Sequence, residues 1–131
     1  MQKTINSPEA MFDLWKELAA TSKILLLHGE LWAGKTTLVK WFAAGLGTNG
    51  DEVTSPTYTY VQTYDNKLLH IDMYNIKTYE ELLHKGILDL IDQYEYIVIE
   101  WPKFIEQLSI ESPTIISIIK KDSSTRELSI I

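Results

Sequence analysis

Two short, continuous apolar runs stand out in the hydrophobic pattern of the chain. The first is ILLL within residues 23–28, and the second is IVI within residues 96–100. Neither run alternates with polar residues, which is typical of strands that are covered on both faces in a largely parallel sheet. We therefore predict two central strands, one ending near His28 and the other at Glu100.

Apolar residues at helical spacing predict a helix on each side of the first central strand. The earlier helix begins at a capping sequence, Ser7-Pro8-Glu9. Its apolar positions are Met11, Leu14, Trp15 and Leu18. The later helix follows Gly34, and its apolar positions are Leu38, Phe42 and Leu46. A third helix is expected from a cap at Thr78 to Gly86.

Two predicted hairpins complete the pattern. Residues 58–64 and 67–72 are rich in aromatic, β-branched and aliphatic residues, and the pair Asp65-Asn66 between them suits a turn. Residues 114–120 and 126–131 flank a second turn at 122–124. We predict a single α/β domain over residues 1–131, a three-layer α/β/α arrangement with a mixed, largely parallel central sheet and a C-terminal β-hairpin.

The segment between the first central strand and the next helix carries the clearest chemical signal. Residues 29–36 read GELWAGKT and fit the pattern G-x-x-x-x-G-K-[ST] of a phosphate-binding loop, or P-loop. Backbone N–H groups and the positive end of the following helix cradle phosphates in such loops. We expect Lys35 to reach the β- and γ-phosphates and the Thr36 hydroxyl to hold Mg²⁺. The expected nucleotide-binding residues are Glu30, Leu31, Trp32, Ala33, Gly34, Lys35, Thr36 and Thr37.

Trp32 is an unusual residue for this loop. Many P-loops place glycine at this position because the backbone there often has a positive φ, which is costly for a bulky side chain. Trp32 keeps its backbone N–H, so no phosphate-binding group is lost. Two alternatives stay open: the ring projects over the mouth of the nucleotide site, or it is exposed to solvent. A nucleotide titration of Trp32→Gly distinguishes them.

Two acids are placed to serve a magnesium triphosphate site. Glu100 and Asp72 each end a predicted strand, and such sites need an acid at the C-terminal end of a strand next to the P-loop. We assign Glu100 to Mg²⁺ through water, and Asp72 to the attacking water or the metal shell. Each acid could instead cap a helix or lie on the surface. Ser55 and Thr57 could approach the γ-phosphate as a switch segment, although Ser-Pro-Thr is also ordinary turn chemistry.

Composition limits the classes of function. The net charge of −6 and a sequence pI near 5.0 oppose autonomous binding to nucleic acid. Residues 1–6 lack the features of a secretory signal, and no segment approaches the roughly eighteen apolar residues of a membrane span. We expect a cytoplasmic protein without a membrane role. The histidines have no metal-ligand spacing and are interpreted as packed or exposed residues: His28, His70 and His84.

Five sequence blocks, in order, resemble the TsaE family, also called YjeE. These are small bacterial P-loop ATPases required for the threonylcarbamoyladenosine (t6A) modification of tRNA. The blocks are GELWAGKTT at 29–37, VTSPTYT at 53–59, HIDMY at 70–74, EEL with a following glycine at 80–86, and IEWP at 99–102. The resemblance implies a single α/β domain with a mixed sheet, which agrees with the predicted strands.

The resemblance also implies roles for individual residues. Lys35, Asp72 and Glu100 would be the catalytic residues, with Thr36 and Glu100 at the metal. Ser55 and Thr57 would belong to a switch loop. Trp101 would be a partner-facing family position beside the site. ATP and Mg²⁺ are the implied ligands. The implied partners are the transferase TsaD and its companion TsaB, with tRNA engaged indirectly through their complex.

The scarcity of arginine bears on the rate of hydrolysis. Arg126 is the only arginine in the chain, whereas an arginine finger can be worth about 10³ to 10⁵ in rate. We therefore expect an ATPase that is slow alone and stimulated by its partners. The alternatives are a small-molecule or nucleotide kinase, which would need an acceptor pocket and a basic lid, and a degenerate P-loop scaffold without turnover. A GTPase is disfavoured because the chain has no N-K-x-D or T-K-x-D segment.

Overall fold

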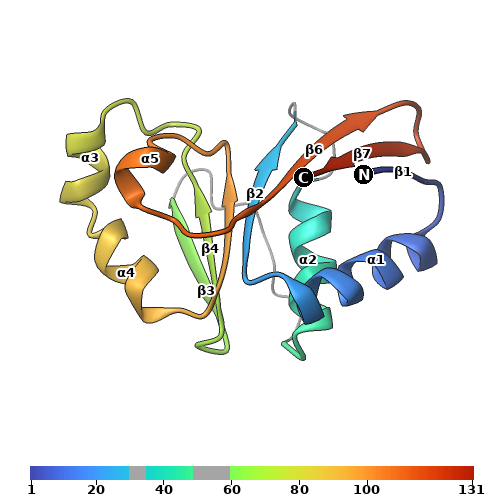
Figure 1. Cartoon of the computed structure of the whole chain (residues 1–131), viewed down its shortest axis with the longest axis horizontal. Coiled ribbons are helices and arrows are strands. Elements are labelled where there is room, and N and C mark those ends of the chain that lie inside the picture. The colour runs from blue at the N-terminus through green and yellow to red at the C-terminus, as the bar shows by residue number, and fades with distance from the viewer. Residues whose placement is uncertain (30–34, 49–59) are drawn as a thin grey trace.

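A mixed β-sheet forms the centre of the molecule in the computed structural model, which describes residues 1–29, 35–48 and 60–131, the side chain of Thr36 excepted (Figure 1). Within these residues seven strands pair in the order β1-β7-β6-β2-β5-β4-β3. The strands are β1 (Gln2–Ile5), β2 (Ile24–His28), β3 (Val61–Tyr64), β4 (Leu68–Asp72), β5 (Tyr96–Glu100), β6 (Thr114–Lys120) and β7 (Arg126–Ile130). The four middle strands, β6, β2, β5 and β4, are parallel to one another, and the outer pairings are antiparallel.

Helices cover both faces of this sheet. They are α1 (Pro8–Thr21), α2 (Lys35–Gly45), α3 (Tyr79–His84), α4 (Ile87–Gln93) and α5 (Ile105–Leu108). The pair α1 and α2 packs on one face, and the shorter helices α3, α4 and α5 lie on the other (Figure 1). The predicted three-layer α/β/α architecture with a mixed sheet is confirmed.

Alternate residues of β2 serve the two layers, which explains why its apolar run is continuous. Leu25 and Leu27 belong to the core beneath α1 and α2, whereas Leu26 belongs to the core beneath α3, α4 and α5. The strand β5 behaves likewise, since Val98 packs with the first core and Ile97 and Ile99 pack with the second. A strand buried on both faces has no solvent side on which to place polar residues.

Aromatic packing and a close backbone approach hold α2 against α1. Trp15 and Phe42 are fully buried, and their ring centroids lie 6.2 Å apart in an edge-to-face arrangement. A Cβ atom added at Gly45 would lie 3.3 Å from the Cβ of Ala19 and 3.3 Å from the Cα of Lys16. The end of α2 therefore lies closer to α1 than a side chain at this position easily permits. This packing fixes the direction in which α2 leaves the sheet edge.

The structure corrects the predicted elements at three short segments. The strand β1 and the helices α4 and α5 were not predicted. β1 reads QKTI and is an edge strand that pairs only through β7, so its sequence lacks a buried apolar run. α4 and α5 have 7 and 4 residues, too few for a clear helical period. Of the strand predicted over residues 58–64, the structure has Val61–Tyr64; Tyr60 is a bend with a φ of 67°, and residues 58 and 59 lie outside the described part. The other predicted helices, strands and the C-terminal hairpin are confirmed.

Candidate active site

The sheet topology brings two acids together at one edge. β2, β5 and β4 are adjacent and parallel, so their carboxyl ends lie at the same edge, where ligands bind in open α/β sheets. In the strand register Glu100 is paired with both Leu27 and Asp72. The side chains of Asp72 and Glu100 also share a face of the sheet. Asp72 lies four residues after Leu68, and Glu100 lies two residues after Val98; Leu68 and Val98 both pack toward α1 and α2. That is the layer to which α2 belongs.

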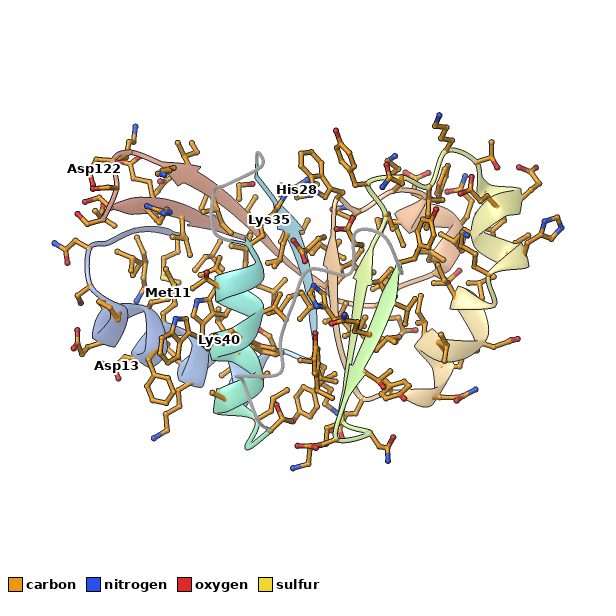
Figure 2. The ribbon with its side chains drawn as sticks, turned by 180° about the vertical axis from the view of Figure 1, so that it is seen from behind. Met11, Asp13, His28, Lys35, Lys40 and Asp122 are labelled. Atoms are coloured by element: carbon orange, nitrogen blue, oxygen red, sulfur yellow. The ribbon has the colours of Figure 1, made fainter. Side chains whose placement is uncertain are left out.

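Lys35 opens α2 beside this edge and is nearly buried. Its side chain is 6% exposed, and its Nζ donates a hydrogen bond of 2.5 Å to the backbone oxygen of Gly29. The same ammonium lies 3.6 Å from the centroid of the Trp101 ring. Figure 2 shows Lys35 at the start of α2, near the end of β2 where His28 lies. The lysine is thus held at the sheet edge by a carbonyl and an aromatic face.

Burial and charge act on Lys35 in opposite directions. Burial lowers the pKa of its ammonium from the ordinary value, while the negative charges of Glu100 and Asp72 act to raise it. The burial effect is the larger of the two. An incoming polyphosphate would add negative charge close to this cation, which favours its protonated form.

Asp72 is fixed at the end of β4 by local hydrogen bonds. It is 1% exposed, and its Oδ1 accepts a hydrogen bond of 2.8 Å from the backbone N–H of Tyr74. Its own backbone N–H donates to the oxygen of Tyr60 at 2.8 Å. Asp72 therefore bends the chain after β4 and keeps its carboxylate at the sheet edge.

Glu100 is held by a histidine on the neighbouring strand. It is 3% exposed, and its Oε2 lies 2.5 Å from Nε2 of His70, which is fully buried. The backbone oxygen of Glu100 accepts a 3.0 Å hydrogen bond from the N–H of Met73. Both the side chain and the main chain of Glu100 are thereby tied to β4 and the residue that follows it.

Trp101 adopts a backbone conformation that few large residues take. Its φ is 53°, in the left-handed region, and its N–H donates to the oxygen of Leu27 at 3.3 Å. Its ring centroid lies 5.0 Å from that of Tyr74. Such backbone strain costs on the order of 1–3 kcal/mol and is concentrated at functional sites. Here it turns the indole back toward Lys35.

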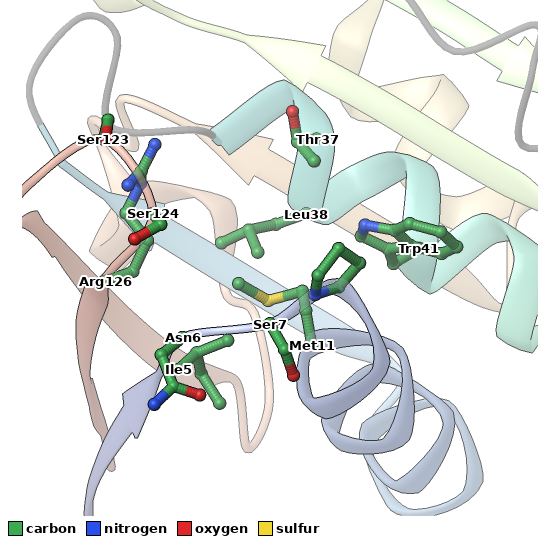
Figure 3. Close-up of a pocket in the computed structure, with 11 residues that line it drawn as sticks. Ile5, Asn6, Ser7, Met11, Thr37, Leu38, Trp41, Ser123, Ser124 and Arg126 are labelled. Carbon is green, nitrogen blue, oxygen red and sulfur yellow. The ribbon is translucent and has the colours of Figure 1, made fainter.

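A cavity of about 410 Å³ opens on the other side of the first turn of α2 (Figure 3). Thr37 and Trp41 of α2 line it, together with Met11 of α1 and Arg126 of β7. Ser124, in the turn before β7, closes another part of its wall. Thr37 lies in the first turn of α2, so the cavity reaches the N-terminal end of this helix.

The sequence comparisons agree with this architecture. The family model described as "Threonylcarbamoyl adenosine biosynthesis protein TsaE" matches residues 5–128. The chain belongs to the TsaE family. The structure resembles the crystal structure of Bacillus subtilis YdiB with a TM-score of 0.68 and 27% identity, covering 99% of this chain and 83% of that one.

Two curated relatives share the TsaE name. A "tRNA threonylcarbamoyladenosine biosynthesis protein TsaE" of Borreliella burgdorferi is 41% identical over 85 residues, 62% of this chain and 61% of the relative. The protein of the same name from Haemophilus influenzae is 40% identical over 81 residues, 60% of this chain and 51% of the relative. The chain thus spans between about half and two thirds of the length of these two TsaE proteins.

Of the predicted site residues, the structure brings together Lys35, Asp72, Glu100 and Trp101. Thr37 is exposed and lines the cavity, and Thr36 lies in the first turn of α2. The remaining predicted residues lie outside the described part of the chain: Glu30, Leu31, Trp32, Ala33, Gly34, Ser55 and Thr57.

His70 and, apart from Thr37, the residues of the cavity wall were not predicted as site residues. His70 forms part of the HIDMY block. Nothing in the sequence spacing shows that its side chain contacts Glu100, which lies 30 residues later at the end of β5. The described residues contain no group of three or more His, Cys, Asp or Glu side chains that could hold a metal. A hard cation here would depend on phosphate oxygens and water besides Asp72 and Glu100, which is how Mg²⁺ is usually bound. No helix among the described residues is long and apolar enough to cross a membrane.

Proposed function

We propose that the chain binds ATP with Mg²⁺ at this sheet edge and hydrolyses it slowly, as its contribution to the t6A modification of tRNA. One observation carries the proposal. A buried ammonium, that of Lys35, lies within electrostatic reach of two buried carboxylates, Asp72 and Glu100, at the start of the helix that follows a P-loop sequence. Two fixed acids beside one cation suit a site that accepts a polyanion together with a divalent metal.

Each residue has a role in this proposal. Lys35 exchanges its hydrogen bond to Gly29 for the β- and γ-phosphates, and the Trp101 ring remains beside its ammonium. Thr36 and Glu100 would hold Mg²⁺, which neutralises charge that develops on the phosphate oxygens. Asp72, held rigid by the N–H of Tyr74, orients the attacking water. Asp72 and Glu100 end β4 and β5, and Lys35 and Thr36 begin α2.

The cavity next to Thr37 is where we propose that the rest of the nucleotide binds. Its volume of about 410 Å³ falls in the range of small-ligand sites, roughly 300–1,000 Å³. Apolar walls from Met11, Leu38 and Trp41 suit a flat base, and Ser124 and Arg126 supply hydroxyl and guanidinium groups. We place adenine and ribose here because the cavity begins two residues from Lys35.

The biological setting is proposed from the family. The relatives are named as tRNA threonylcarbamoyladenosine biosynthesis proteins, and the net charge of −6 makes direct binding of tRNA unfavourable. ATP binding and hydrolysis therefore act on the modification through the protein partners TsaD and TsaB, which hold the tRNA. We also propose a cytoplasmic location and a single domain over residues 1–131.

Isothermal titration calorimetry with ATP and Mg²⁺ tests the nucleotide site. The wild-type chain is expected to bind, and Lys35→Ala is expected to lose binding or hydrolysis. Lys77→Ala is the matched control, because Lys77 is an exposed lysine in the segment between β4 and α3. Well-folded wild-type protein that gives no heat with ATP and Mg²⁺ would refute the proposal.

A further inference from the structure

A buried row of polar side chains leads from the edge strand β3 to the active-site acid. The Tyr64 hydroxyl donates to Oε1 of Gln62 at 2.6 Å and lies 3.3 Å from Nδ1 of His70. The other ring nitrogen of His70, Nε2, lies 2.5 Å from Oε2 of Glu100. Tyr64 and Glu100 are 4% and 3% exposed, and His70 is fully buried. None of the roles proposed above uses His70 or Tyr64.

The strand register places these groups on one face of the sheet. His70 is paired with Gln62 on β3 and with Val98 on β5. Tyr64 and Glu100 each lie two residues further along those strands, so both are diagonal neighbours of His70 on the same face. This face carries α2, and therefore also Lys35. The row ends at the proposed ATP site and not on the opposite face.

We propose that His70 is a positioning residue that fixes the carboxylate of Glu100 for its role at the nucleotide. Tyr64 lies at hydrogen-bond distance from one imidazole nitrogen and Glu100 from the other. The ring therefore cannot turn without losing a buried hydrogen bond. His70 in turn engages Oε2 of Glu100, which leaves Oε1 to face the bound water or metal. The inference rests on the proposed function, because it concerns the geometry of an acid that ATP hydrolysis uses.

The expected loss of activity is taken from residues that orient the ligands of other metal sites. Removing such a supporting partner typically costs about 10- to 100-fold in metal affinity or activity. A histidine that only satisfied a buried polar group would act differently. Its loss would lower the stability of the fold without altering the balance between nucleotide binding and turnover.

Four variants separate these roles. His70→Leu removes both hydrogen bonds, and His70→Gln keeps a side-chain N–H that can reach Glu100. Tyr64→Phe removes the outer contact to His70 and leaves the inner one. The matched control is His84→Gln, since His84 is an exposed histidine at the end of α3. Each variant is first checked for folding by circular dichroism and thermal unfolding.

ATP affinity and turnover are then measured with Mg²⁺ in excess. We expect His70→Leu to lower kcat by about 10- to 100-fold, with the Kd for ATP changed by less than about threefold. His70→Gln should recover most of the lost kcat, and Tyr64→Phe should lose less than His70→Leu. The double variant His70→Leu/Glu100→Gln should be no slower than Glu100→Gln alone, because the two residues act as a unit.

Two results of these kinetic measurements would overturn the inference. A folded His70→Leu with wild-type kcat would show that Glu100 needs no support. Equal losses in affinity, turnover and stability, without recovery in His70→Gln, would show a purely structural role.

A measurement without nucleotide keeps the inference testable if wild-type protein does not hydrolyse ATP at all. The proton between His70 and Glu100 should give a downfield, slowly exchanging imidazole signal in the proton NMR spectrum. The signal should persist in Tyr64→Phe and disappear in Glu100→Leu. Its absence from the wild-type spectrum, or its survival in Glu100→Leu, overturns the positioning role, whereas its presence in an inactive protein refutes only the proposed ATPase.

Discussion

At the scale of single residues, the site is a balance of buried charges. Asp72 and Glu100 are 1% and 3% exposed, and both act electrostatically on the ammonium of Lys35, which is 6% exposed. A triphosphate entering here would add several negative charges beside two carboxylates. Like charges in a poorly solvated site repel strongly. A divalent cation removes most of this repulsion, so ATP should bind as its magnesium complex.

The Glu100→Gln substitution tests this balance at one acid. Glutamine keeps the shape of the side chain but removes its negative charge, so repulsion of the phosphates decreases while support of the metal is lost. We expect the Kd for ATP to change by less than about fivefold and kcat to fall at least about tenfold, as for other groups that act mainly in the transition state. Calorimetry and phosphate release measure the two quantities. Glu106→Gln, an exposed glutamate of α5, is the control; equal effects of both variants would contradict the role of Glu100.

The sequence predicted the acids but not what orients them. Asp72 and Glu100 each follow an apolar run, and the ends of adjacent parallel strands meet at one edge, so both were expected at the P-loop. His70 was interpreted only as packed or exposed, because its contact with Glu100 depends on β4 and β5 being neighbours with a particular register. Strand order and register depend on contacts between distant segments, which local sequence patterns do not reveal. The rest of the cavity wall beyond Thr37 was missed for the same reason, since it combines α1, α2 and the β6–β7 turn.

At the scale of elements, short turns with special backbone geometry set the strand pairing. Asp65 and Asn66 both have positive φ, 51° and 54°, as the two central residues of a tight hairpin turn require. The turn between β3 and β4 was predicted from these two residues. In the β6–β7 turn, a single carboxylate, that of Asp122, accepts the hydrogen bonds instead. This second turn also carries part of the cavity wall.

The hydrogen bonds of Asp122 predict a pH-dependent contribution to stability. Its Oδ1 accepts from the backbone N–H groups of Ser124 and Thr125 at 2.9 and 2.8 Å, and from the Ser124 hydroxyl at 3.2 Å. The backbone hydrogen bond from Ser124 is the main cause that lowers the pKa of Asp122. The unfolded chain therefore binds this proton more readily, so the stabilisation is present above about pH 4 and is lost as the pH falls through the lowered, folded-state pKa.

Asp122→Ala should accordingly lower the melting temperature modestly at pH 7. The difference from wild type should shrink as the pH is lowered below about 4, where the wild-type carboxylate becomes protonated. Asp122→Asn retains an oxygen acceptor without the charge, so its smaller effect should not vary with pH in this range. Thermal unfolding followed by circular dichroism at several pH values measures both variants. A difference for Asp122→Ala that stays constant from pH 7 to pH 3 would exclude the ionised form as the stabilising one.

The packing of α2 against α1 predicts how much single side chains contribute to the stability of the fold. Phe42 is fully buried between Trp15 and Tyr96, with ring centroids at 6.2 and 6.4 Å. Phe42→Ala should lower the free energy of unfolding by about 3–5 kcal/mol, because it removes a large side chain and leaves a cavity. Phe12→Ala is the comparison, since Phe12 is half-buried and its ring packs mainly on Trp41. Urea denaturation should give a loss on the order of 1 kcal/mol there; similar losses at both positions would refute this account of the packing.

At the scale of the whole molecule, the chain provides a nucleotide site with few cations. Its net charge is −6 and its single arginine is Arg126. That guanidinium donates through Nη1 to the backbone oxygens of Asp122 and Thr125 at 3.0 and 3.2 Å, so it is engaged in the β6–β7 turn. The described residues at the carboxylate edge contribute Lys35 as the cation close to both acids. Fast phosphoryl transfer usually relies on further positive charge at the γ-phosphate.

A partner that supplies this charge should therefore control the rate. We expect the isolated chain to hydrolyse ATP well below the roughly 1–100 s⁻¹ typical of kinases. Addition of TsaD, TsaB and tRNA should raise the rate at least about tenfold, a small part of the 10³- to 10⁵-fold that an arginine finger can supply. Phosphate release is measured with each component left out in turn, and Lys35→Ala in the full mixture controls for hydrolysis by the partners themselves. Because an arginine finger acts only when it is held in position at the γ-phosphate, added guanidinium or salt should not replace the partners. An isolated chain that already turns over at several per second would mean that the described site lacks nothing, and the partners would then act only after hydrolysis.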